Sequence, residues 1–335
     1  MKRTRVHEFT NSSIHQFISF LFLVLFLPSC SKDCDLNGID FPQEMRNLVS
    51  EISRYAKETK PGFIVIPQNG IELVSKNLEP DGIPDSAYLA SIDGCGQEDL
   101  FFGYDHDDEA TPSGETAWLR SFLDIAKGRG KTILVTDYCS TPSRIDQSYA
   151  LNEAAGYIGF AATERGLNVI PSLQSPIWGE NNAVVASLTG AKNFLYLIDP
   201  GNYLKKQDFI QAVTATNYDI LIMDLFFTAG SAFVSTEIDQ LRMKANGGRR
   251  LVIAYMSIGE AEDYRWYWQP DWKPGDPDWL CKENPDWEGN YKVEYWNPAW
   301  KQIIYGTGDS YLDKILAAGF DGVYLDLIDA YEYFE

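Results

Sequence analysis

Short apolar runs alternate along this chain with longer amphipathic stretches, and this alternation restricts the fold more than any other feature. The runs are apolar throughout, which is typical of strands in a parallel sheet that is buried on both faces. We identify nine candidate strands: 63–67, 100–104, 132–136, 167–171, 194–198, 220–223, 251–256, 291–296 and 322–325. Stretches of helical length lie between most of them: 44–57, 115–127, 146–165, 206–216, 237–244 and 300–318.

Strands that alternate with helices indicate βα units with right-handed crossovers, in either a closed barrel or an open doubly wound sheet. No GxGxxG or Walker pattern follows any run, which argues against a nucleotide-binding sheet. About 300 residues remain after the N-terminal segment discussed next, and that length suits one barrel of roughly 250 residues with insertions. We therefore predict an α/β fold, a single (β/α)8 TIM barrel over residues 41–335, in which 167–171 or 291–296 is peripheral.

The order of the elements is unusual for such a barrel. A helix, 44–57, comes before any strand, and the strand 320–326 has no helix after it. A barrel can close only if this last strand pairs with the first one, and the early helix then serves as the crossover between them. This order is what a circular permutation leaves, so we predict a permuted barrel.

The N-terminal segment has the pattern of an export signal. Basic residues at positions 2, 3 and 5 precede an apolar run over 17–27, which is shorter than the roughly 17–25 residues that span a bilayer. Leu-Pro-Ser-Cys at 27–30 resembles a bacterial lipobox. We predict a signal peptide over 1–29, lipidation of Cys30 and a linker over 30–40. The protein would then be exported and lipid-anchored at the outer membrane or cell surface, with no other contact with the membrane.

Charge and composition exclude several kinds of partner. The formal net charge is −20, with 48 acidic against 28 basic residues, whereas phosphate binding needs basic patches. We therefore expect no nucleic acid partner. The whole chain has only three His, and the four Cys after the lipobox are scattered, without a CxxC pair, so we expect no zinc or iron–sulfur site and no cofactor. Whether Cys95 and Cys139 pair is left open.

Acidic and amide side chains gather where the predicted strands end. In a TIM barrel the active site lies at the carboxyl ends of the strands, and functional sites often accept the repulsion between packed like charges. Glu98 precedes the run 100–104, and the others follow or end their strands. The set is Gln68, Asn69, Glu98, Asp137, Tyr138, Asp199, Asp224, Glu260, Glu262, Asp326 and Asp329.

Two kinds of chemistry suit such an acidic mouth: glycoside hydrolysis by a carboxyl pair, or binding of a divalent cation. A dense aromatic stretch over 266–300 favours a glycan, because exposed aromatic faces stack on sugar rings. We expect most of these rings to pack on the barrel rim, and we take Trp268 as the candidate platform. Glu260 and Glu262 could instead only pair with Arg265.

Three motifs resemble the family 114-type glycoside hydrolases: VIAYMSIGEAEDYRWYW at 252–268, WEGNYKVEYWNPAW at 287–300 and GFDGVYLDLIDAYEY at 319–333. The subgroup is the one labelled extracellular cysteinyl-tRNA-synthetase-like, and no synthetase motif is visible. IVIPQNGIEL at 64–73, IDGCGQEDLFF at 92–102 and ILVTDY at 133–138 look like the second half of the same domain. They come first here, which agrees with a permutation.

The resemblance implies an endo-α-1,4-polygalactosaminidase-like glycosidase. Its carboxyl pair maps onto Asp326 and Glu98, with Asp329 as the alternative to Asp326, and the Gln68-Asn69 strand lies between them. The substrate-binding candidates are Asp329, Asp224, Tyr255, Glu260, Gln68, Asn69, Tyr138, Asp137 and Trp268.

We expect a cell-surface glycosidase that cleaves an amino-sugar polysaccharide of the galactosamine type. The alternative is a non-catalytic glycan-binding lipoprotein, which a distance beyond ~10 Å between the two carboxyls would favour. A metal-dependent hydrolase would need three oxygen ligands that converge on one point.

Overall fold

A computed structural model describes residues 38–335 except 174 and 229. The predicted signal peptide, the lipidation site Cys30 and most of the linker lie outside the described residues. Within the described part, no helix is both long and apolar enough to cross a membrane. The described residues belong to one compact unit.

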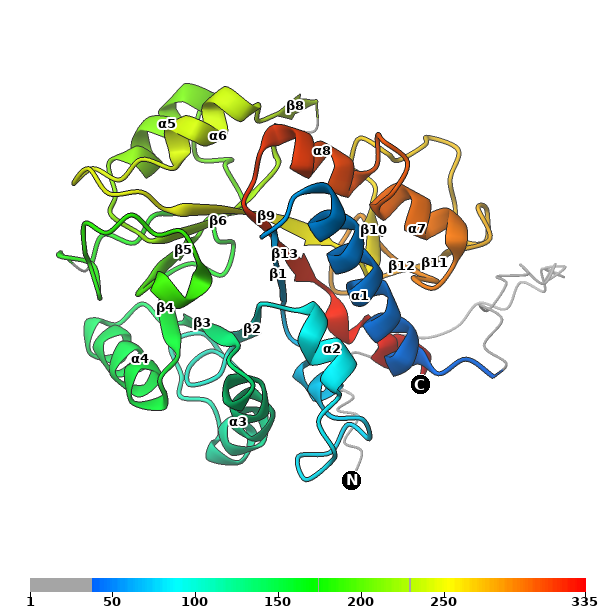
Figure 1. Cartoon of the computed structure of the whole chain (residues 1–335), viewed down its shortest axis with the longest axis horizontal. Helices are drawn as coiled ribbons and strands as arrows, with labels where there is room; N and C mark the ends of the chain where they lie inside the picture. The colour runs from blue at the N-terminus through cyan, green and yellow to red at the C-terminus, as the bar shows by residue number, and fades with distance from the viewer. Residues whose placement is uncertain (1–37, 174, 229) are drawn as a thin grey trace, which may run out of the picture. The chain divides into compact units, whose positions relative to one another are not determined.

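Two parallel sheets form the core of this unit, and helices cover them on the outside (Figure 1). The larger sheet has the order β1 (Ile64–Pro67), β13 (Gly322–Asp326), β9 (Leu251–Ser257), β6 (Ile220–Asp224) and β5 (Phe194–Tyr196). The smaller sheet has the order β2 (Gly94–Glu98), β3 (Thr132–Tyr138) and β4 (Ile158–Ala162). The predicted mixed α/β class with a parallel sheet is confirmed.

The two sheets meet along β1 and β2. Gln68 and Gly96 form a parallel bridge, the Asn69 amide donates to the Gly96 carbonyl at 3.0 Å, and the Asp93 amide donates to the Val65 carbonyl at 2.9 Å. β1 therefore lies between β13 on one side and β2 on the other, as predicted for the Gln68-Asn69 strand.

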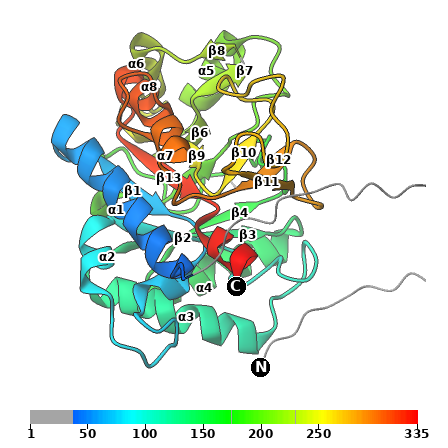
Figure 2. The same cartoon turned by 90° about the vertical axis from the view of Figure 1, so that its right-hand side faces the viewer.

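The first helix forms where the sequence predicts it. α1 (Phe41–Thr59) begins at Asp40, whose carboxylate accepts from the Gln43 amide at 3.0 Å, and proline stands in its first turn. Its buried face packs on the core, and the C-terminal segment lies beside its start (Figure 2), where the Phe41 and Phe334 rings are 5.5 Å apart. The ends of the described chain are thus adjacent.

The remaining elements are shorter. The α-helices are α2 (Ser86–Ser91), α3 (Ser113–Gly128), α4 (Pro142–Ala155), α5 (Lys206–Thr214), α6 (Ser235–Leu241), α7 (Pro298–Ile304) and α8 (Tyr311–Ala318). The 3₁₀ helices are η1 (Ile71–Val74), η2 (Leu188–Gly190) and η3 (Ile328–Phe334). Two small antiparallel sheets join β7 (Phe226–Thr228) to β8 (Ser231–Ala232), and β10 (Glu260–Glu262) through β12 (Asn290–Val293) to β11 (Leu280–Glu283).

Two predicted strands are wrong. Residues 100–104 form bends after β2, because Asp99 takes a positive φ of 57° and turns the chain. The true strand, β2, is Gly-Cys-Gly-Gln-Glu and has no apolar run. Its glycine at 96 is required, since a Cβ there would lie 1.9 Å from the Tyr324 hydroxyl.

Residues 167–171 are also irregular, and the strand in that region is β4, which we had placed within the helix 146–165. Gly156 ends α4 in the left-handed conformation, φ 70°, and the chain turns into β4 directly after it. Likewise, the predicted helix 300–318 is two helices, separated by glycines at 306 and 308 with positive φ. The run 291–296 contributes to the peripheral strand β12, as expected.

Candidate active site

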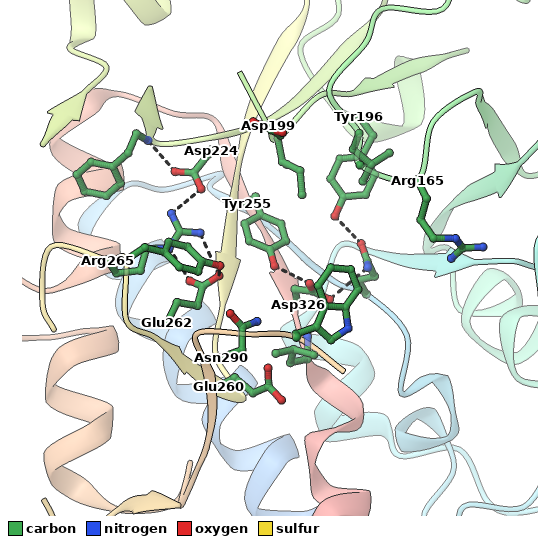
Figure 3. Close-up of a pocket in the computed structure, with 18 of the residues that line it drawn as sticks. Arg165, Tyr196, Asp199, Asp224, Tyr255, Glu260, Glu262, Arg265, Asn290 and Asp326 are labelled. Atoms are coloured by element: carbon green, nitrogen blue, oxygen red, sulfur yellow. Dashed lines mark hydrogen bonds and ion pairs between the residues drawn. The ribbon is translucent and has the colours of Figure 1, made fainter. Parts of the chain in front are cut away.

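A cavity of about 810 Å³ opens at the carboxyl ends of the parallel strands (Figure 3). Residues at or just after the ends of β1, β2, β3, β5, β6 and β13 line it. Seven carboxylates and two guanidinium groups are in the lining, which gives it a strongly negative charge: Glu98, Asp199, Asp224, Glu260, Glu262, Asp326 and Asp329, with Arg165 and Arg265.

One amide connects the two carboxyl groups singled out by the sequence. Gln68 Nε2 donates to Glu98 Oε2 at 2.8 Å and to Asp326 Oδ1 at 3.2 Å. Those two oxygens are therefore no more than 6.0 Å apart. Since the two N–H bonds of an amide diverge, a separation of about 5 Å is expected.

A further hydrogen bond, to the oxygen of the Gln68 amide, fixes the orientation of that amide. The Tyr196 hydroxyl, which is buried, donates to Gln68 Oε1 at 2.9 Å, so Nε2 must face the carboxyl pair. Gln68 itself is only 2 % exposed. The amide is thus a rigid spacer between Glu98 and Asp326.

Each carboxyl group receives further donors. Glu98 accepts from Asn69 Nδ2 at 3.1 Å and from the Tyr138 hydroxyl. Asp326 accepts from the Tyr255 hydroxyl at 2.6 Å and from the amide of Leu327 at 2.9 Å (Figure 3). Four substrate-binding candidates, Gln68, Asn69, Tyr138 and Tyr255, are therefore brought to the pair, where they orient its carboxyl oxygens.

The environment raises the pKa of both carboxyls. Burial raises the pKa of Asp326 to about 6, against the opposing effect of the Tyr255 hydroxyl and the Leu327 amide. Burial and the negative charge of Asp326 raise the pKa of Glu98. Because the two groups interact, their titration belongs to the pair, and the charge of either carboxyl disfavours that of the other.

Asp329 lies one turn beyond Asp326 in η3 and also lines the cavity. Burial and the neighbouring Glu332 raise its pKa to about 7. Asp326 differs in that two hydrogen bonds, from the Tyr255 hydroxyl and the Leu327 amide, oppose the effect of burial on its pKa.

A buried cluster of charged side chains, Asp224, Glu262 and Arg265, also lines the cavity. Arg265 Nη1 contacts Asp224 Oδ2 at 2.5 Å, and its Nε contacts Glu262 Oε2 at 2.5 Å (Figure 3). Glu262 thus pairs with Arg265, as the alternative interpretation of the sequence predicted. Glu260 does not: it is fully buried, and its Oε1 accepts from Asn284 Nδ2 at 2.9 Å.

Two substrate-binding candidates, Asp137 and Trp268, lie outside the cavity lining. Asp137 is fully buried and away from the cavity lining, where its carboxylate accepts from Ser148, from Asn152 and from the amides of Phe101 and Phe102. It holds the segment after β2 against β3.

Trp268 does not line the cavity either, because its ring packs on Trp272 and Tyr291, with centroids 5.4 and 4.9 Å away. The aromatic residues that do line the cavity on this side are Tyr264, Trp266 and Trp287, and Trp287 is 63 % exposed. We had counted Trp266 and Trp287 within the aromatic stretch, but composition alone could not separate exposed rings from packed ones.

Arg165 is a lining residue that sequence reasoning missed. Its guanidinium lies 3.8 Å from the centroid of the Tyr138 ring and pairs with Asp99 at 2.9 Å and Asp107 at 2.7 Å. It therefore supports the tyrosine that contacts Glu98. Arg165 had been taken as the last residue of a helix, and that position carried no signal.

The structure decides whether Cys95 and Cys139 form a disulfide. Cys95 and Cys139 are both free and buried. Cys95 lies opposite Ile133 in the β2–β3 pair, and Cys139 is six residues further along, at about 3.3 Å per strand residue. That distance is too long for a disulfide. Among the residues described, no group of three or more His, Cys, Asp or Glu could hold a metal ion.

A known family model matches the C-terminal part of the chain. Residues 186–335 match the model of glycoside-hydrolase family GH114. The match supports GH114 as the family. The matched segment holds Asp326, Asp224 and Arg265, whereas Glu98 and Gln68 precede it.

Curated relatives align over a similar length. An uncharacterized protein of Deinococcus radiodurans is 45% identical over 126 residues, and one of Methanocaldococcus jannaschii is 46% identical over 126 residues. These alignments cover 38% and 37% of this chain, and 38% and 34% of the two relatives. A Thermotoga maritima protein, also uncharacterized, is 38% identical over 36% of each chain. The chain thus matches little more than a third of the length of each relative.

Proposed function

We propose that this protein is a glycosidase that cleaves an amino-sugar polysaccharide of the galactosamine type with Glu98 and Asp326. The observation that carries the proposal is the Gln68 bridge, which limits the two carboxyl oxygens to 6.0 Å. Retaining glycosidases use a separation of roughly 5–5.5 Å, and inverting ones roughly 6.5–9.5 Å. The spacing therefore favours a retaining mechanism.

The environment of each carboxyl suggests its role. Asp326, whose carboxylate accepts two hydrogen bonds, would attack the anomeric carbon in its ionised form. Glu98, whose pKa is raised by burial and by the charge of Asp326, would protonate the leaving oxygen as the C–O bond breaks. In the second step, the Glu98 carboxylate would take a proton from water, whose oxygen displaces Asp326 from the sugar. Both steps balance without a cofactor.

The charge of the cavity supports an amino-sugar substrate. Its two guanidinium groups are already paired with carboxylates, so the remaining lining is acidic. An acidic cleft attracts protonated amines and repels uronic acids. The family resemblance supports galactosamine as the sugar, since the characterised activity is on polygalactosamine.

We further infer that the two parallel sheets form one closed, circularly permuted (β/α)8 barrel. The hydrogen bonds between β1 and β2 support closure on one side. The adjacent ends of the described chain support a permutation, because such a rearrangement needs termini that lie close together. We also propose export and lipidation at Cys30, on the lipobox-like sequence alone.

The direct test is hydrolysis of partly deacetylated polygalactosamine, measured by the release of reducing ends. Glu98→Gln and Asp326→Asn should each lower kcat by at least ~10³-fold, with the fold retained. Proton NMR of the first product should show the anomeric configuration of the substrate. Unchanged activity in both variants would refute the assignment, and an inverted product would refute the retaining mechanism.

The same assay separates hydrolysis from the alternative, a lipoprotein that only binds glycans. A binder would retain the polymer without releasing ends, in the wild type as in the variants. The short carboxyl separation removes the geometric reason for preferring that alternative.

A further inference from the structure

The cavity wall next to Asp326 carries two carboxylates that the Glu98–Asp326 pair does not use. Asp329 is partly exposed in the cavity, and no hydrogen bond or ion pair from another side chain reaches its carboxylate within the described chain. Glu260 is fully buried in the same wall, and its Oε2 has no hydrogen-bond partner among the described residues. Burial raises the pKa of Tyr333, and the charges of Glu260 and Asp329 raise it further, so these two carboxylates lie on one side of the cavity.

The charge at this place is unbalanced. Arg265 is occupied by Asp224 and Glu262. Lys292, which lies opposite Glu260 in the β10–β12 pair, has its ammonium 4.1 Å from the centroid of the Tyr333 ring and makes no ion pair in the described part of the chain. A buried carboxylate with an unpaired oxygen costs free energy, which a cation bound nearby would offset.

A large exposed ring completes this wall. Trp287 lines the cavity from the loop between β11 and β12, and Glu260, Asn290 and Asp326 line the same cavity (Figure 3). A sugar that stacks on the Trp287 indole would place its ring substituents close to the acidic wall. Stacking depends on the apolar face of the sugar, whereas the carboxylates respond to its charge.

We propose that Asp329 and Glu260 form an ammonium-binding subsite for the sugar next to the one held at Asp326. Asp329 contacts the amino group, and Glu260 adds negative charge from beneath. Trp287 supports the ring of the same sugar. This subsite rests on the proposed function, because it assigns the residues that distinguish an amino sugar from its N-acetylated form.

The environment of Asp329 predicts a signature that a merely structural residue would not give. Burial and Glu332 raise its pKa to about 7, so an ammonium that binds beside it favours the ionised form and releases a proton. Below neutral pH, binding of an amino sugar should therefore be accompanied by proton release. Binding of the neutral N-acetylated sugar should not.

The test uses calorimetric titration of the Glu98→Gln variant, which retains the subsite without turnover. The two probes are an α-1,4-linked tetramer of galactosamine and its fully N-acetylated counterpart, each measured at about pH 6 in two buffers of different ionisation enthalpy. Adding Asp329→Asn should weaken binding of the amino tetramer about ten- to hundredfold and abolish the proton release. Glu260→Gln should weaken it less, and Glu288→Gln, an exposed carboxylate outside the cavity, less than about twofold.

Neither Asp329→Asn nor Glu260→Gln should change binding of the N-acetylated tetramer by more than about twofold. Trp287→Ala should weaken both tetramers alike, because stacking does not depend on charge. Equal losses for both tetramers in Asp329→Asn, or an amino tetramer that binds without proton release, would overturn the subsite. So would failure of the Glu98→Gln variant to bind either tetramer. The glycosidase proposal is judged separately, by release of reducing ends from the wild type.

Discussion

Removal of one hydroxyl, in Tyr255→Phe, should move the acid limb of the pH–rate profile. The Tyr255 hydroxyl donates to Asp326 Oδ2 at 2.6 Å from a buried position, and phenylalanine retains the shape of the ring. A hydrogen bond to a charged group contributes about 1.5–3 kcal/mol, and one pKa unit corresponds to about 1.4 kcal/mol. The pKa of Asp326, which is about 6, should therefore rise by roughly one to two units.

The direction follows from the role of Asp326. It must be ionised to attack, so a higher pKa moves the acid limb of kcat/KM to higher pH by the same amount. At about pH 5 the variant should lose roughly ten- to hundredfold in kcat/KM, and the loss should shrink as the pH rises. Tyr138→Phe provides the contrast, because its hydroxyl contacts Glu98 and its loss should move the basic limb upward.

The assay is release of reducing ends between about pH 4 and 9. Tyr157→Phe is the matched control, since its hydroxyl also donates to a carboxylate, Asp124, at 2.6 Å but lies outside the active-site cavity. Its profile should match that of the wild type. If Tyr255→Phe lowers the rate by the same factor at every pH, the hydroxyl does not act through the ionisation of Asp326, and the assigned roles are wrong.

Three further perturbations test the stability and the charge of the molecule. Lys244→Met should lower the free energy of unfolding by about 3–5 kcal/mol in denaturant titrations, because Lys244 and Asp219 form a fully buried ion pair at 2.8 Å; exposed Lys205→Met should change it by less than about 0.5 kcal/mol. Asp329→Asn should raise Tm by a few degrees at pH 8, by calorimetry. A carboxyl whose pKa is about 7 in the folded state and about 4 in the unfolded state destabilises the fold progressively between those two values, so the gain should shrink as the pH falls from about 7 towards 3. Raising NaCl from about 50 to 500 mM should lower kcat/KM on the cationic polymer several-fold and leave that on its N-acetylated form almost unchanged. A constant Tm gain or equal salt effects would contradict the electrostatic reasoning.

The fold could be predicted where apolar runs coincide with strands, as in β6, β9 and β13. It could not at β2, because Gly94 and Gly96 make room for neighbouring groups and leave no apolar pattern. The same limit applies to β4, which follows α4 after only two residues, Gly156 and Tyr157. The periodic pattern of apolar residues shows which faces of an element are buried through their side chains. A strand that packs against its neighbours through its backbone has little such pattern.

The site was predictable for residues that end strands and less so for residues on loops. Glu98, Gln68 and Asp326 are adjacent because β1 lies between β2 and β13, an order that the family resemblance implied. The choice between Trp268 and Trp287 was not predictable. Trp268 stands in the loop between β10 and β11, and Trp287 stands in the next loop, between β11 and β12. Only the contacts of Trp268 with other rings decide which one is exposed.

Backbone conformation adds a constraint that the residue types alone do not predict. Each of the three strands that carry the carboxyl pair and its bridging amide is followed by a non-glycine residue in the left-handed region: Asn69 at φ 58°, Asp99 at φ 57° and Leu327 at φ 60°. Leucine is costly there, and such residues persist when surrounding contacts hold them. At Leu327 the benefit is visible, because the turn directs its amide to Asp326 Oδ1 at 2.9 Å. The same turn ends β13 and starts the helix that carries Asp329. Strain at this position therefore stabilises the charge of one carboxyl and places a second one in the cavity, which is why the chemistry lies at the strand ends rather than within the strands.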